Sequence, residues 1–303
     1  MLQLESLLRD AFKGKGFQKI NVIIQEKDKY VPQKCTKQLL KQLDKALKRE
    51  LDKNEFSNVS LLLKCIQLYC RNGPPESINL LLQQGLIPKI RHPTFILPSG
   101  RVDLVSDAVE ICSFDFCLHV SPVYMVTWFE RTREFLSLIE PKENKHLVNL
   151  VEDFFNATLV IGKNSTEGRK QLLDTFIQHV GHLATEPNVN CALRQEALRT
   201  LNTLLGNVTR EEKKAFAASE EMCLLMKEFV KTIQDVGDYD IQVALVEALF
   251  RLMLKKCRDD MVHSWFEDQY VTEVFREIKD GDFETDSRKF LNELNERLGD
   301  KRR

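Results

Sequence analysis

The chain of 303 residues lacks any long uninterrupted run of apolar residues, and this absence limits the classes to which it can belong. No apolar stretch approaches the ~18 residues that a helix needs to cross a bilayer. The N-terminal stretch MLQLESLLRDAFKGKG contains acidic residues and no extended apolar segment, so it is unlike a secretory signal. We therefore expect a soluble intracellular protein with no membrane contact.

The sequence also lacks an excess of either charge, because 44 Lys and Arg residues face 45 Asp and Glu residues and the net charge is −1. This balance argues against a protein that binds nucleic acid over its whole surface, but it permits a local basic patch. Most of the eight cysteines lie within apolar helical patterns, which is typical of reduced, buried thiols rather than of a disulfide framework.

What dominates the sequence is helical periodicity. In CALRQEALRTLNTLLGN, leucine and alanine side chains recur at helical spacing and form one stripe, while Arg194, Gln195, Arg199 and Asn202 face elsewhere. Long apolar helices are predicted to start near Asn58, Leu147, Cys191 and Ile241, and an amphipathic helix follows each of the last three. The steps between these starts are 89, 44 and 50 residues. Because armadillo and HEAT repeats have periods of roughly 40–47 residues, the last two steps favour such a repeat and the first is about twice too long.

Residues 90–124 explain the long step. They contain three of the nine prolines and two cysteines, and they interrupt what otherwise reads as one amphipathic helix, GLIPK followed by MVTWFE. We interpret residues 90–124 as a mostly irregular insertion, of the kind that alternative splicing introduces, with the helix restarting near Met125. The alternative is a long ordered loop with a short strand or helix of its own.

Four stretches are unusual enough to compare with known families: GLIPK joined to MVTWFE, GDYDIQVALVEALFRL, HSWFEDQYV and FETDSRKFLNELNERLGDKRR. They resemble the N-terminal region of the synaptonemal complex protein 2 family. The resemblance covers most of residues 1–89 and 125–303, is strongest over 237–303, and does not include 90–124.

This resemblance implies an armadillo-repeat-like domain over residues 1–303. It also implies a role on meiotic chromosome axes and at centromeres in germ-cell nuclei, with chromosome-axis, centromere or chromatin proteins as partners. In the family a pleckstrin-like domain and a C-terminal coiled coil would follow, and residues 1–303 contain neither. Functions of the coiled coil are therefore not expected of this stretch.

One line of lysines is the strongest charge feature. It consists of Lys34, Lys37, Lys41, Lys45 and Lys48, whose spacing of three or four residues places them along one side of a helix with leucines opposite. Residues 27–49 hold eight basic and two acidic residues. This lysine line is a candidate contact for DNA phosphates or for an acidic protein segment. The alternative interpretation is a solvated face that keeps an outer helix soluble.

No other motif indicates chemistry. Asp238 and Asp240 are interpreted as candidate N-caps of the apolar helix that follows them. No set of His and Cys residues provides four zinc ligands, and no nucleophile has an evident base, so we expect no metal, no cofactor, no small-molecule substrate and no enzyme activity. The pairs Trp128–Phe129 and Trp265–Phe266 are predicted to pack in the core. The sequence thus predicts an all-α, armadillo/HEAT-like helical solenoid that serves as a non-enzymatic protein-interaction module.

Overall fold

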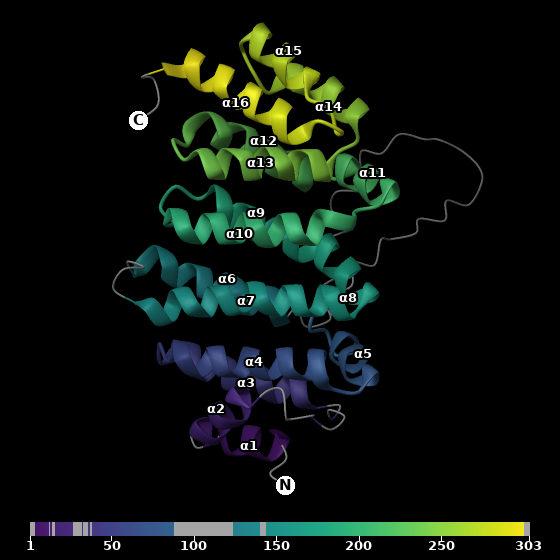
Figure 1. Cartoon of the computed structure of the whole chain (residues 1–303). Helices are drawn as coiled ribbons and strands as arrows, with labels where there is room; N and C mark the ends of the chain where they lie inside the picture. Colours follow the sequence, from purple (N-terminus) through teal and green to yellow (C-terminus); the bar gives the residue numbers. More distant parts are fainter. Residues whose placement is uncertain are drawn as a thin grey trace, which may run out of the picture.

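All regular structure in the computed structural model is helical over the residues that it describes, which are 4–11, 13, 16–26, 32, 36, 38–87, 124–139 and 144–299. This confirms the predicted all-α class. The N-terminal end of the stack is formed by α1 (Leu4–Ala11), α2 (Phe17–Gln25), α3 (Leu39–Asp52) and α4 (Phe56–Asn72), as Figure 1 shows.

Four units of three helices follow, each with a short first helix and two longer ones. Their members are α5 (Pro75–Gln83), α6 (Tyr124–Leu138) and α7 (Lys145–Asn164); α8 (Thr166–Gln171), α9 (Ile177–Thr185) and α10 (Cys191–Leu204); α11 (Arg210–Ala218), α12 (Glu220–Asp235) and α13 (Tyr239–Leu252); and α14 (Lys255–Met261), α15 (Gln269–Glu277) and α16 (Phe283–Leu298). From one unit to the next, the starts of the first helices (α5, α8, α11 and α14) are 91, 44 and 45 residues apart. The last two steps match the armadillo-like period, which confirms the predicted solenoid.

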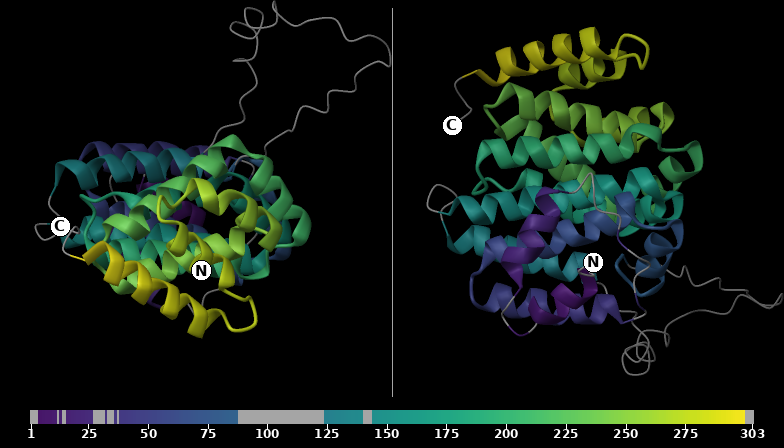
Figure 2. Two further views of the ribbon diagram at one scale, coloured as in Figure 1. Left: turned by 90° about the horizontal axis from the view of Figure 1, so that it is seen from above. Right: turned by 60° about the horizontal axis from the view of Figure 1, so that its bottom comes forward.

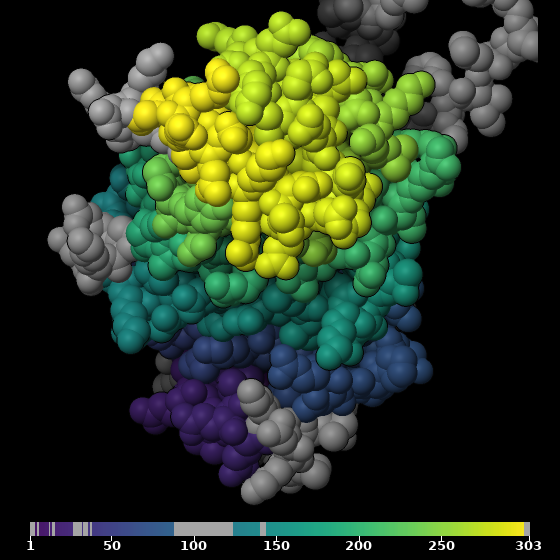
Figure 3. Space-filling model, turned by 45° about the horizontal axis from the view of Figure 1, so that its top comes forward, coloured from purple at the N-terminus to yellow at the C-terminus, as the bar shows by residue number. Residues whose placement is uncertain are grey.

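The units stack so that equivalent helices pack on one another. The third helices form one face, with α4, α7, α10, α13 and α16 in contact in that order, whereas α3, α6, α9 and α12 lie behind them in the same order. Figure 2 shows this arrangement from the end of the stack and from below. Figure 3 shows the last unit, with α16 in yellow, lying over the C-terminal end. The stack therefore presents two long lateral surfaces made from different helices.

The core is continuous along the stack. Buried apolar residues from Leu4 to Leu294 belong to one packed cluster. Trp128 and Phe129 are each 1% exposed, which confirms their predicted core position. Phe129 of α6 meets three aromatic rings of α7 and the π-helical turn η2 (Leu172–Phe176), with ring centroids 5.1–6.2 Å apart. Trp265 and Phe266 are also buried. Each unit is thus held to the next by apolar contact.

The chain turns sharply before the predicted insertion. Gly85, which follows the C-cap of α5, has φ of 90°, a left-handed conformation that favours glycine. Leu86 and Ile87 are buried but lie in this turn rather than opening a new helix. The predicted insertion lies outside the described residues except for Tyr124, which the structure assigns to α6 instead. Tyr124 and Trp128 lie one helical turn apart in α6, with their ring centroids 5.7 Å apart.

Candidate interaction surfaces

The helix α3 carries the described part of the lysine line. Its leucines are buried, as are Ala46 and Glu50, so one side of the helix is fixed against the core. Lys41, Lys45 and Lys48 are exposed on the opposite side. Lys34 and Lys37 lie outside the described residues. The structure therefore brings three of the five predicted lysines together on the surface of the stack.

The three lysines differ in their electrostatic environment. Lys48 Nζ lies 2.9 Å from Asp44 Oδ2, and the other oxygen of Asp44 accepts a hydrogen bond of 2.9 Å from Trp128 Nε1. Asp44 therefore neutralises Lys48 while it joins α3 to α6. Lys41 and Lys45 form no ion pair with any residue in the described part of the chain. Among the described lysines of the line, they are the two whose charge no described carboxylate compensates.

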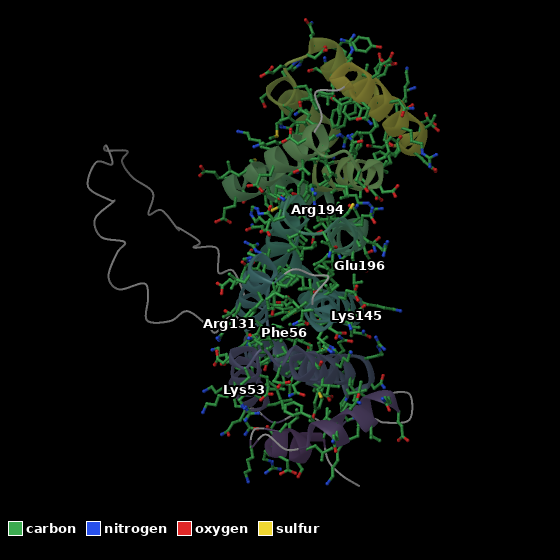
Figure 4. The ribbon with its side chains drawn as sticks, turned by 90° about the vertical axis from the view of Figure 1, so that its left-hand side faces the viewer. Lys53, Phe56, Arg131, Lys145, Arg194 and Glu196 are labelled. Carbon is green, nitrogen blue, oxygen red and sulfur yellow. The ribbon has the colours of Figure 1, made fainter. Side chains whose placement is uncertain are left out.

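The basic surface ends where α3 meets the next unit. Asp52 near the end of α3 pairs with Arg131 of α6, so the two charges compensate each other. Lys53 follows immediately and is exposed. Figure 4 shows Lys53 and Arg131 on one side of the stack and Lys145 and Glu196 on the other. The helix α3, which carries the described lysines, contacts α6 and so belongs to the layer of the second helices.

The face of the third helices has polar hollows. One hollow of about 430 Å³ lies where α2, α4 and α7 meet, and it is lined by Ile24, Gln25, Lys64, Gln67, Leu68, Arg71, Asn72, Asp153 and Asn156. In its lining, the nearly buried carboxylate of Asp153 accepts one hydrogen bond from Ser60 Oγ and lies 3.1 Å from Lys64 Nζ. This carboxylate is therefore already satisfied by the protein and serves to join α4 to α7.

A second hollow of about 420 Å³ lies between α10 and α13. Asn202 Nδ2 donates to the backbone oxygen of Ala244 at 2.9 Å, and Arg251 donates to the backbone oxygen of Asn202 at 3.0 Å. Asn202 is only 6% exposed, although the sequence placed it away from the apolar stripe. Arg194 is buried as well and donates to the backbone oxygen of Ala184 at 2.8 Å. Periodicity missed both residues because it marks only apolar contacts.

The two candidate caps have different positions. Asp238 Oδ1 accepts a hydrogen bond of 2.9 Å from the amide of Ile241 and is the N-cap of α13, whereas Asp240 lies in the first turn. Asp238 also accepts a hydrogen bond of 3.0 Å from the thiol of Cys191 on α10. This bond, with those from Ile241 and Gln195, outweighs partial burial and lowers the pKa of Asp238. The cap thus also links two neighbouring units.

Two histidines at helical spacing on α9 bond to carboxylates of neighbouring units. His179 Nδ1 lies 2.6 Å from Glu130 of α6, and His182 Nδ1 lies 2.9 Å from Glu228 of α12. Within the described residues, no three His, Cys, Asp or Glu side chains gather as metal ligands would. Among the helices that are described, none is both long enough and apolar enough to span a membrane.

The fold defines the chain as an armadillo-like helical solenoid. The sequence profile of the family described as the synaptonemal complex 2 armadillo-repeat-like domain matches residues 3–93 and 118–212. The chain therefore belongs to the synaptonemal complex protein 2 family, as the sequence resemblance indicated.

Individual relatives match almost the whole chain. Synaptonemal complex protein 2-like of Xenopus laevis is 47% identical over 97% of this chain, and its counterpart in Mus musculus is 41% identical over 100%. Synaptonemal complex protein 2 of Homo sapiens is 32% identical over 99%. The chain spans only 26%, 32% and 18% of these three relatives, respectively. A solved structure of a synaptonemal complex protein has a TM-score of 0.77 and 31% identity, covering 99% of this chain and 69% of that one.

Proposed function

We propose that this chain is a non-enzymatic protein-interaction module of a meiotic protein associated with chromosome axes or centromeres in germ-cell nuclei. Membership of the synaptonemal complex protein 2 family supports the meiotic role. The physical support is the uninterrupted stack, since stacked helical units present extended surfaces on which a partner chain can lie. The proposed partners are axis, centromere or chromatin proteins.

Quantitative affinity capture tests this proposal. The purified chain is used as bait in nuclease-treated meiotic nuclear extract, with an unrelated armadillo-like solenoid of similar net charge as the control. We expect chromosome-axis or centromere proteins to be enriched on this chain, and a binary assay with the purified candidate then establishes direct contact. Equal recovery on both baits, or failure of every candidate to bind directly, contradicts the proposal.

A second function, sequence-independent binding of DNA or chromatin, is supported by the uncompensated charges of Lys41 and Lys45. Contacts from lysine to phosphate release counterions, so the affinity falls steeply as salt rises. With two lysine contacts from α3, the affinity for duplex DNA should fall by about 12-fold between 50 and 200 mM salt. Fluorescence anisotropy of a labelled duplex measures this fall.

Charge reversal on α3 separates the two functions. We expect the triple variant Lys41→Glu, Lys45→Glu and Lys48→Glu to lose DNA binding and its salt dependence. A control triple variant replaces the exposed residues Lys163, Lys227 and Lys231 with Glu and has the same net charge. Equal loss in both variants contradicts a specific role of α3. Binding to an axis protein that survives the α3 substitutions favours the first function.

A further inference from the structure

The two ends of the predicted insertion are joined by backbone hydrogen bonds. The amide of Tyr124 donates to the carbonyl oxygen of Gly85 at 3.3 Å, and the amide of Met125 donates to that of Leu86 at 3.0 Å. In both pairs the donor lies 39 positions after the acceptor. An α-helix forms the same bonds between residues four positions apart. Both bonds would therefore be ordinary helical bonds if 35 residues between them were removed.

We infer that a segment of 35 residues between Ile87 and Tyr124 is a removable cassette, inserted in register at the first turn of α6. One matching bond could arise from many chain paths, but two consecutive bonds with the same offset fix both the position and the rotation of α6 relative to the turn. This inference concerns the fold and does not depend on the proposed function.

The residues on both sides of the segment belong to the buried core of the stack. Leu86 and Ile87 are 0% and 1% exposed, and Met125 and Trp128 are 2% and 1% exposed. Neither flank can therefore shift without exposing apolar surface. In the shortened chain, Pro88 would fall in the first helical turn, where proline is tolerated because its missing N–H has no helical partner there.

The family comparison has a break of its own within the same stretch. The profile of the armadillo-repeat-like domain matches up to residue 93 and resumes at residue 118. The stretch that the profile leaves unmatched therefore lies wholly between the two hydrogen-bonded flanks. The unmatched stretch, 94–117, is 24 residues long and is shorter than the segment of 35 residues that the two hydrogen bonds enclose.

Three deletions in the full chain test the register. Deletion of 89–123 removes 35 residues and retains Tyr124, whereas deletion of 89–122 removes 34 and deletion of 88–123 removes 36. Each residue too many or too few rotates α6 by about 100° relative to the turn at Gly85 and Leu86. Either the two backbone hydrogen bonds or the packing of Trp128 must then be lost. We expect the 35-residue deletion to keep the melting temperature of the full chain or to raise it. We expect the other two to melt about 3–10 °C lower than the 35-residue deletion or to fail to fold.

The outcomes separate clearly when melting is followed by circular dichroism. The inference is overturned if the 35-residue deletion melts below the full chain, if it fails to fold, or if all three deletions melt at the same temperature. A sharp optimum at 35 residues supports it, including the case in which the 34- and 36-residue deletions are insoluble.

Discussion

Replacing Phe129 with Ala should lower the free energy of unfolding by about 3–5 kcal/mol. Phe129 is 1% exposed and its ring meets Phe154 and Phe155 of α7 and Phe176 of η2. The substitution removes a buried ring from the contact between two stacked units, and the large neighbouring rings cannot close the cavity without leaving their own positions. Chemical denaturation monitored by circular dichroism measures the loss.

The same helix provides a matched control. Leu138 lies at the end of α6 and is 79% exposed, so Leu138→Ala should change the free energy of unfolding by less than about 0.5 kcal/mol. If Phe129→Ala is no more destabilising than Leu138→Ala, then α6 does not pack in the stack as described.

Replacing Arg258 with Met should cost about 2–4 kcal/mol, the second largest effect that we expect. Arg258 is 3% exposed, its guanidinium lies 3.7 Å from the centroid of the Phe250 ring, and burial lowers its pKa. It donates to the backbone oxygen of Met253 at 3.2 Å and to Asp280 at 2.9 Å. Methionine retains much of the apolar stem but leaves the oxygen of Met253 without this donor. Urea unfolding measures the effect.

Arg297 is a matched control because it makes the same kinds of contact at the surface. Its guanidinium lies 4.1 Å from the centroid of the Tyr270 ring and 2.8 Å from Asp268, but the Arg297 side chain is 44% exposed. Solvent screens such a pair, so Arg297→Met should cost less than about 1 kcal/mol. Equal costs for the two arginine substitutions would show that the buried position of Arg258 does not stabilise the last unit.

Sequence periodicity was sufficient for the long helices, because each buries an apolar stripe that repeats every three or four residues. It was insufficient for the first helices of the units. The helix α11 has one buried residue, Phe216, and so lacks an apolar stripe. Its sequence signal is a capping box, in which Thr209 Oγ1 accepts from the amide of Glu212 and the Glu212 carboxylate accepts from the amide of Thr209.

The candidate surfaces were predictable only in part. The spacing of Lys41, Lys45 and Lys48 placed them on one side of a helix, but it carried no information on the pairing of Lys48 with Asp44. Likewise, the polar residues Asn202 and Arg194 are buried because they bond to backbone oxygens of other segments. Such partners lie 42 and 10 positions away in the chain, beyond the range over which helical periodicity acts.

Amide hydrogen exchange at Tyr124 and Met125 tests most directly whether the repeats form one continuous stack where α6 meets the turn after α5. These amides stand at a helix start, where first-turn amides have no helical acceptor, yet here they bond to Gly85 and Leu86. In the intact chain we predict that the Met125 amide exchanges at least about 100-fold more slowly than the exposed first-turn amides of Lys145 and His146 in α7. If the Met125 amide exchanges as fast as that of Lys145, the hydrogen bond to Leu86 does not form. That result would contradict the continuous stack.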